Sequence, residues 1–139
     1  MSSEPSNIQI RELATLMDHT AVSSVAFDPT GRFVVTGSWD NTAKVWRMPS
    51  DGAAATYVAT LAGHSGSVYS VAFDPTGRFV ATGSDDKTAK VWRMSPDGAA
   101  ATCVATLAGH SSYVSSVAFD PTGRFVATGS QDGTAKVWK

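Results

Sequence analysis

One unit is repeated along this chain at an interval of 46 residues, and the repetition limits the possible folds more than any other feature. Equivalent residues recur at that interval, such as Asp28, Asp74 and Asp120, or Trp46, Trp92 and Trp138. The second and third copies are almost identical, since Leu61–Arg93 and Leu107–Lys139 differ at only six of 33 positions. Fixed periods of about 20–50 residues are typical of solenoids, propellers and arrays. The sequence therefore predicts a repeat protein.

Each unit consists of short strand-like segments separated by turns. Val68–Phe73 reads "VYSVAF", an alternating run rich in β-branched and aromatic residues, which is typical of a strand. Asp74–Arg78, "DPTGR", has the proline and glycine of a tight turn. Phe79–Ser84 and Thr88–Trp92 continue as second and third strands, and 101–108 supplies a fourth. Frequent proline, glycine and β-branched residues disfavour helix, so we expect an all-β chain.

Composition and charge exclude several classes of function. Hydrophobic residues make up 42% of the 139 positions, and 11 basic against 12 acidic residues leave a net charge of −1. There is no basic stripe for nucleic acid, no apolar run long enough to span a membrane and no signal-peptide core. The single cysteine, Cys103, excludes an intrachain disulfide. We expect a cytoplasmic protein that contacts neither nucleic acid nor membrane.

The recurring residues resemble the repeat of the WD40 family. The family's glycine–histidine pair stands at Gly63-His64 and Gly109-His110, its turn aspartates are Asp40, Asp86 and Asp132, and its tryptophans are Trp46, Trp92 and Trp138. The first copy departs by having Asp18-His19, and a basic residue (Arg47, Arg93 or Lys139) follows each tryptophan in place of aspartate. The resemblance covers the chain from about residue 12. It implies a WD40 β-propeller built from four-stranded antiparallel blades.

The resemblance also implies a structural set of hydrogen-bonded side chains in each blade. The set joins the histidine, a second-strand hydroxyl, the turn aspartate and the tryptophan. Thr82 and Ser84 alternate onto the same face of their strand, so either could supply the hydroxyl. The candidate members are His19, Asp40, Trp46, His64, Thr82, Ser84, Asp86, Trp92, His110, Asp132 and Trp138.

Three catalytic or ligand-binding alternatives are weaker than this framework role. A recurring His, Asp and Ser suggests a hydrolase, but catalysis needs one pre-organised constellation rather than three similar ones. Asp85-Asp86 suggests a cation site, but no further carboxylate follows at calcium-loop spacing. The glycine- and alanine-rich "GAAAT" segments lack the lysine of a phosphate loop. We therefore expect no enzyme activity, metal or cofactor.

The differences between the copies gather at one end of the predicted blades. Three fall at the start of the first strand and two in the hairpin between the second and third strands, and these connections lie at the same end of an antiparallel blade. Tyrosine and tryptophan there suit a partner-binding face, while the alternative is drift in loops that face water. The candidate face contains Trp39, Asn41, Ser67, Tyr69, Asp85, Lys87, Tyr113 and Gln131.

The order of strands predicts how such blades are completed. Residues 11–18 align with the fourth, outer strands, although no blade precedes them, and residues 110–139 make a blade that lacks its outer strand. Between them lie blade 1 (19–63) and blade 2 (64–109) of one WD40 domain spanning 1–139. Residues 11–18 are therefore expected to complete the last blade of a neighbouring chain. Complementary head and tail surfaces of this kind can close a homo-oligomeric ring.

The number of chains and the function stay open between alternatives. A homotrimer would have nine blades and a homodimer six, and the mostly small residues of the outer strands favour the trimer because they let blades lie more nearly parallel. The first functional hypothesis is a non-catalytic scaffold or interaction module that binds a protein or peptide on the loop face. The second, suggested by the near-identity of the copies, is a designed or excised propeller fragment with no ligand.

Overall fold

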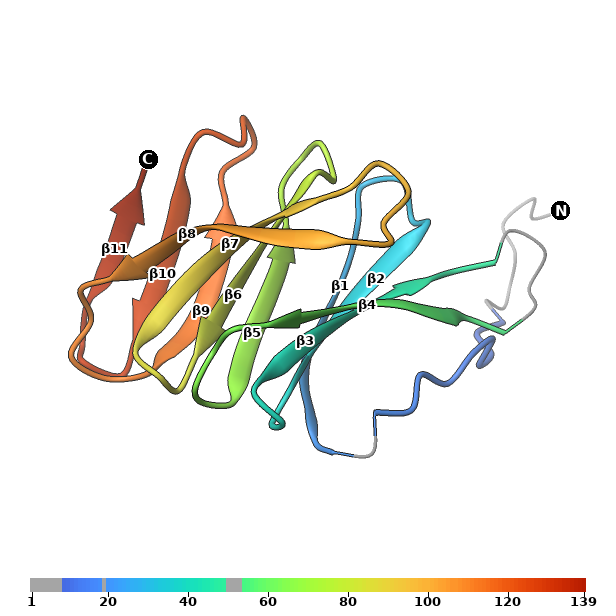
Figure 1. Cartoon of the computed structure of the whole chain (residues 1–139), viewed down its shortest axis with the longest axis horizontal. Helices are drawn as coiled ribbons and strands as arrows, with labels where there is room; N and C mark the ends of the chain where they lie inside the picture. The colour runs from blue at the N-terminus through green and yellow to red at the C-terminus, as the bar shows by residue number, and fades with distance from the viewer. Residues whose placement is uncertain (1–8, 19, 50–53) are drawn as a thin grey trace, which may run out of the picture.

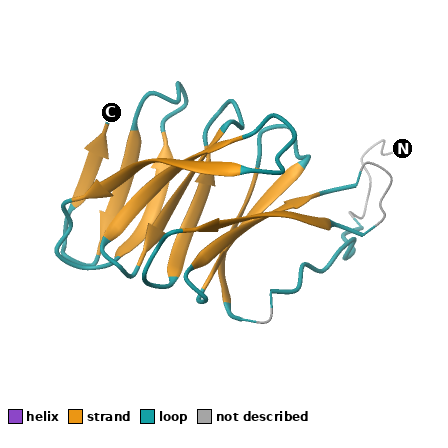
Figure 2. Ribbon diagram, in the orientation of Figure 1, coloured by secondary structure: helices purple, strands orange, loops and turns teal. Residues whose placement is uncertain are grey.

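The computed structural model describes residues 9–18, 20–49 and 54–139, in which eleven strands form three sheets (Figures 1 and 2). Sheet 1 contains β1 (Val22–Phe27), β2 (Phe33–Ser38), β3 (Thr42–Arg47) and β4 (Thr56–Ala62). Sheet 2 contains β5 (Val68–Phe73), β6 (Phe79–Ser84), β7 (Thr88–Met94) and β8 (Ala101–Ala108). Sheet 3 contains β9 (Val114–Phe119), β10 (Val126–Ser130) and β11 (Ala135–Trp138).

Every strand pair in these sheets is antiparallel, and neighbouring strands in the chain are neighbours in the sheet. Sheets 1 and 2 have four strands each, while sheet 3 has three within the described residues. The predicted all-β fold of antiparallel sheets is thus confirmed, and the sheets are consistent with the expected blades. Closure of a ring by further chains stays a prediction.

The three sheets stack face to face, as Figure 1 shows. We call the side of each sheet that contacts the following sheet its forward face, and the opposite side its rear face. Between sheets 1 and 2 the core joins forward residues such as Val35, Val45 and Leu61 to rear residues such as Val68 and Trp92. Between sheets 2 and 3 it joins Ala81 and Ala89 to Val114, Val117 and Val126. The strand alternation seen in the sequence produces these two faces.

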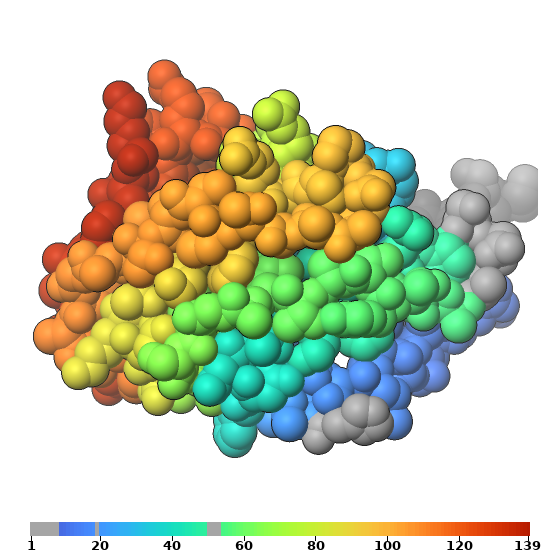
Figure 3. Space-filling model, in the orientation of Figure 1, coloured from blue at the N-terminus to red at the C-terminus, as the bar shows by residue number. Residues whose placement is uncertain are grey.

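Two glycines let adjacent sheets approach closely. A Cβ atom built on Gly37 would lie 3.0 Å from the Val68 side chain, and one built on Gly83 would lie 2.8 Å from the Val114 side chain. The contact at Gly83 is shorter than real Cβ atoms show and the contact at Gly37 is tighter than most, so a larger residue at either position would require the neighbouring valine to shift. The outer strands β4 and β8 also contact each other and run side by side in Figure 3.

Residues 9–18 form no strand within the single chain. The segment reaches sheet 1, where the Asp18 carboxylate lies 3.0 Å from Lys44 Nζ. The expected strand over 11–18 concerns pairing with another chain and stays a prediction. The described residues include no helix of the length and hydrophobicity that crossing a membrane requires.

Candidate functional site

A hydrogen-bonded chain of four side chains crosses sheet 2. The indole N–H of Trp92 donates to Thr82 Oγ1 over 2.9 Å, and Thr82 Oγ1 lies 2.6 Å from His64 Nε2. At the other side of the ring, His64 Nδ1 lies 2.8 Å from Asp86 Oδ2. An ionised carboxylate only accepts hydrogen bonds, so Nδ1 of His64 carries the proton. The Nε2 atom of the neutral ring then accepts a hydrogen bond from the Thr82 hydroxyl. Each of these four side chains then has its hydrogen-bond partners.

Electrostatics support this neutral histidine beside an ionised aspartate. Burial lowers the pKa of His64, outweighing the opposing effect of its hydrogen bond to Asp86. Burial acts to raise the pKa of Asp86, but hydrogen bonds from Thr88, His64 and the Ser65 amide together lower it to about 2. At neutral pH the pair therefore keeps one proton on the imidazole and a charge on the carboxylate.

Sheet 3 repeats the arrangement. Trp138 Nε1 donates to Thr128 Oγ1 over 2.9 Å, His110 Nε2 lies 2.8 Å from that hydroxyl, and His110 Nδ1 lies 2.9 Å from Asp132 Oδ2. Hydrogen bonds from the Thr134 hydroxyl and from His110 lower the pKa of Asp132 despite the opposing effect of burial. The same geometry in two copies is typical of a framework rather than of a single reaction centre.

Sheet 1 keeps part of the arrangement. Trp46 Nε1 donates to Thr36 Oγ1 over 3.0 Å, and the Asp40 carboxylate accepts from Lys44 Nζ over 2.8 Å. Burial acts to raise the pKa of Asp40, but hydrogen bonds from Lys44 and Thr42 lower it to about 2. The predicted member His19 lies outside the described residues.

Threonine, not the alternative Ser84, supplies the hydroxyl. Ser84 Oγ donates to the carbonyl of Gly66 over 3.0 Å and accepts from the Asp86 amide over 3.1 Å, so it tightens the hairpin next to the chain. Thr36 and Thr128 belong to the arrangement but were not singled out from the sequence. Their spacing of 46 residues from Thr82 is the signal that identifies them.

The eight candidate binding residues lie in the β2–β3, β6–β7 and β10–β11 hairpins and at the starts of β5 and β9. These hairpins and strand starts form one end of the sheets, the lower end in Figure 1. Ser67 Oγ donates to the Trp39 carbonyl over 3.3 Å, which joins the ends of sheets 1 and 2. The rings of Tyr69 and Tyr113 meet edge to face, with centroids 5.2 Å apart, and join sheets 2 and 3. Trp39, in the β2–β3 hairpin at the same end, is 59% exposed. We call Trp39, Tyr69 and Tyr113 the aromatic row.

The remaining candidate residues hold the aromatic row or shape its turns. Tyr69 Oη donates to Asp85 Oδ1 over 3.2 Å, and Tyr113 Oη donates to Gln131 Oε1 over 3.0 Å. The third copy has Gln131 at the position of Asp85. Both copies therefore have a side-chain oxygen there that accepts a hydrogen bond from a tyrosine hydroxyl. Asn41 and Lys87 occupy a left-handed turn position, with φ of 76° and 75°. The hairpin there constrains the backbone while its side chains stay free to vary.

The opposite end is constant for a structural reason. Asp74 is buried, and its carboxylate accepts from the Phe79 amide over 3.0 Å and from the Thr76 hydroxyl over 2.7 Å. Asp28 binds its own turn in the same way. Sequence changes in these turns would remove the hydrogen bonds that hold them. The lack of variation at this end therefore does not by itself mark the variable end as a binding face. The case for binding rests instead on the aromatic row, in which Trp39 is exposed and the two tyrosines are half-buried.

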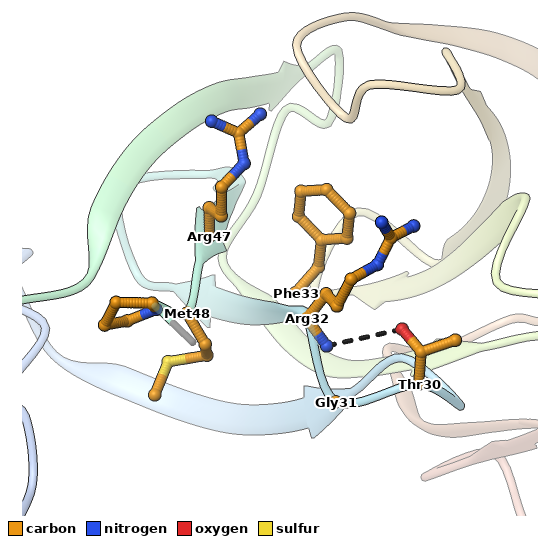
Figure 4. Close-up of a pocket in the computed structure, with 7 residues that line it drawn as sticks. Thr30, Gly31, Arg32, Phe33, Arg47 and Met48 are labelled. Carbon is orange, nitrogen blue, oxygen red and sulfur yellow. Dashed lines mark hydrogen bonds between the residues drawn. The ribbon is translucent and has the colours of Figure 1, made fainter. Parts of the chain in front are cut away.

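The constant end also carries basic side chains stacked on phenylalanine. In Figure 4 the guanidinium groups of Arg32 and Arg47 lie beside the Phe33 ring, each 5.7 Å from its centroid. Arg47 also donates to the Asp97 carbonyl over 2.9 Å, which ties sheet 1 to the hairpin before β8. These contacts stabilise the junction between sheets. Among the described residues, no group of three or more potential metal-ligating side chains gathers anywhere.

The family model described as "WD domain, G-beta repeat" matches residues 10–47, 55–93 and 101–139. The chain belongs to the WD40 family. A comparison with curated protein sequences finds no match to it. WD40 repeats indicate a protein-interaction or scaffold module, and such domains are generally non-catalytic.

The three WD40 matches divide the chain in a different place from the sheets. The second match begins just before β4 and the third begins with β8, and each ends at the close of a third strand. The first match begins at residue 10. Residues 10–18 therefore hold the position in their repeat that β4 and β8 hold in theirs.

Proposed function

We propose that this WD40 chain is a non-catalytic scaffold that binds a protein or peptide partner at the aromatic row and acts as a ring of identical chains. The single observation that carries the binding proposal is the aromatic row itself, which spans all three sheets and leaves Trp39 59% exposed. Aromatic side chains contribute much of the free energy of protein interfaces. Polar groups around the row, such as Asp85 and Gln131, suit the rim of such a surface.

Peptides selected from a random displayed library against the full chain should bind at the aromatic row. Because aromatic anchors dominate interface energy, we expect the double variant Trp39→Ala/Tyr69→Ala to weaken the selected peptides by about tenfold or more. Isothermal titration calorimetry measures the change. The matched control is Arg78→Ala at the constant end, which should leave affinity unchanged. Equal binding by the double variant, or loss only in the control, would place the partner surface elsewhere.

Ring formation is supported by the two strand positions that lack a partner within the described chain. Residues 10–18 match the position of an outer strand but form none, while β11 has a strand neighbour on one side only. Pairing residues 11–18 of one chain with β11 of the next would give every blade four strands. Unpaired strand edges otherwise invite uncontrolled association.

A homotrimer with nine blades is the assembly that we propose. Nine blades need about 40° between neighbours and six need about 60°. The contact between β4 and β8 fits the shallower angle, because the outer edges of neighbouring sheets separate as that angle grows. The small residues of these strands allow the approach. A homodimer of six blades is the alternative, and dimers are commoner in general.

The mass of the assembly in solution should be three times that of one chain. Each chain has a mass of 14.5 kDa, so light scattering during size-exclusion chromatography separates the possibilities clearly. A mass of two chains would replace the trimer with the six-bladed dimer. A single-chain mass at all concentrations would refute ring formation by identical chains.

The second functional hypothesis, a designed or excised fragment without a ligand, is favoured by the near-identity of the copies at 27 of 33 positions (33 − 6 differences). It makes the same prediction about assembly. It differs at the aromatic row, where it expects the library selection to yield no peptide that depends on Trp39 or Tyr69.

A further inference from the structure

We infer that the forward face of sheet 3 binds the rear face of sheet 1 in a second copy, with Gly129 of one chain against Val22 of the next. The inference rests on the proposed ring, but it concerns packing between sheet faces, not pairing at strand edges. Its template is the contact that the chain makes twice internally, between sheets 1 and 2 and between sheets 2 and 3.

The rear faces differ in exposure at equivalent positions. Val68 and Val114 are both 0% exposed, whereas the equivalent Val22 is 43% exposed. Three residues further along the same strands, Val71 and Val117 are 6% and 7% exposed, whereas Val25 is 63% exposed. The same residue types are thus buried wherever a preceding sheet covers them. On the rear face of sheet 1, β1 has the residues of this interface without their cover, whereas Val34 and Trp46 on the neighbouring strands are 7% and 8% exposed.

The forward face of sheet 3 shows the complementary difference. A Cβ atom on Gly37 or Gly83 would contact the valine of the next sheet at 3.0 or 2.8 Å, whereas one on Gly129 meets only Ser116 Cβ, at 3.8 Å. Gly129 therefore leaves open the space that a valine fills at the two internal interfaces. In the same face, Val137 is 72% exposed while the equivalent Val45 is 0% exposed.

A hydrogen bond between the first strands of successive sheets occurs twice in the chain, and the third equivalent serine has no following sheet to bond. Ser24 Oγ accepts from the Val71 amide over 3.3 Å, and Ser70 Oγ accepts from the Val117 amide over 3.2 Å. Each bond joins the first strand of one sheet to the first strand of the next. Ser116 is the equivalent serine, and its expected donor is the Val25 amide of a second copy.

A second copy is the occupant that fits both faces at once. The two faces differ from each other and are complementary, which is the condition for a head-to-tail contact between identical chains. Residues 10–16 of the same chain line a groove beside Val25 and Phe27. They nevertheless leave both side chains more than 60% exposed. The chain's own segment therefore does not replace the missing sheet over β1.

Two single variants, each blocking one face, test the inference by light scattering at equal chain concentration. Gly129→Val places a β-branched side chain in open space within one chain, but the methyl groups would collide with Val22 of the next copy. Val22→Asp places a charge on the opposite face at a position that is 43% exposed in the single chain. We expect each variant alone to lose the assembly and run as single chains with an unchanged circular dichroism spectrum.

Mixing the two variants should restore one contact. Val22→Asp keeps its forward face and Gly129→Val keeps its rear face, so the mixture should form pairs of one chain each and nothing larger. The control is Gly133→Asn, which copies Asn41 at the equivalent hairpin position and should keep the wild-type mass. If the wild type assembles and Gly129→Val keeps the same mass, this inference fails while the proposed ring stands. A wild type that is always a single chain refutes both.

Discussion

Replacing Trp92 by alanine should lower the free energy of unfolding by about 3–5 kcal/mol, because it leaves a large cavity between sheets 1 and 2. Trp92 is only 3% exposed, and its indole N–H is the donor that holds Thr82. Urea unfolding at a fixed chain concentration measures the change, since any assembly adds to the apparent stability.

Trp39→Ala is the matched control for this measurement. It removes the same side chain from a turn where the side chain is 59% exposed, and we expect a change within about 0.5 kcal/mol. His64→Ala should fall between the two, at about 1–3 kcal/mol, because it leaves the buried Thr82 hydroxyl without its acceptor and removes one of the donors to Asp86. Unchanged stability in both His64→Ala and Trp92→Ala would move these residues from framework to surface and reopen a functional role for them.

Deleting residues 1–17 should abolish the closed assembly and cause aggregation or partial unfolding. In the proposed ring every junction between chains loses its outer strand, and the edge of β11 is left bare. Size-exclusion chromatography with light scattering gives the mass, and thermal melting followed by circular dichroism gives the stability.

A point substitution separates the loss of a strand from the loss of chain length. Ala14→Pro keeps all 139 residues but removes one backbone donor from the middle of the expected strand, so it should weaken the assembly in the same direction. Deleting only residues 1–8 is the control and should preserve the mass. If the chain without residues 1–17 keeps its assembly size and melting behaviour, strand exchange is the wrong explanation.

The choice between Thr82 and Ser84 illustrates a limit of sequence reasoning. Strand alternation puts both hydroxyls on one face, so spacing alone treats them alike. The hairpin decides between them: Ser84 is drawn to the Gly66 carbonyl, and Thr82 stays within reach of both Trp92 and His64. The constant end is a second case. Its lack of variation suggested a contrast with a binding face, but the buried carboxylate of Asp74 explains it through the turn alone.

The sequence by itself determined that this is an all-β repeat chain, because a period of 46 residues, alternating strands and glycine-proline turns allow few other arrangements. Its resemblance to the WD40 repeat implied the four-stranded blade. The sequence also determined which residues recur, and so which could form a framework. Only the tertiary structure decided which face of each sheet meets the next. Strand alternation distinguishes the two faces of a sheet but does not say what covers each face. Val22 and Val68 are the same residue at equivalent positions, yet Val22 is exposed and Val68 is buried because only sheet 2 has a preceding sheet.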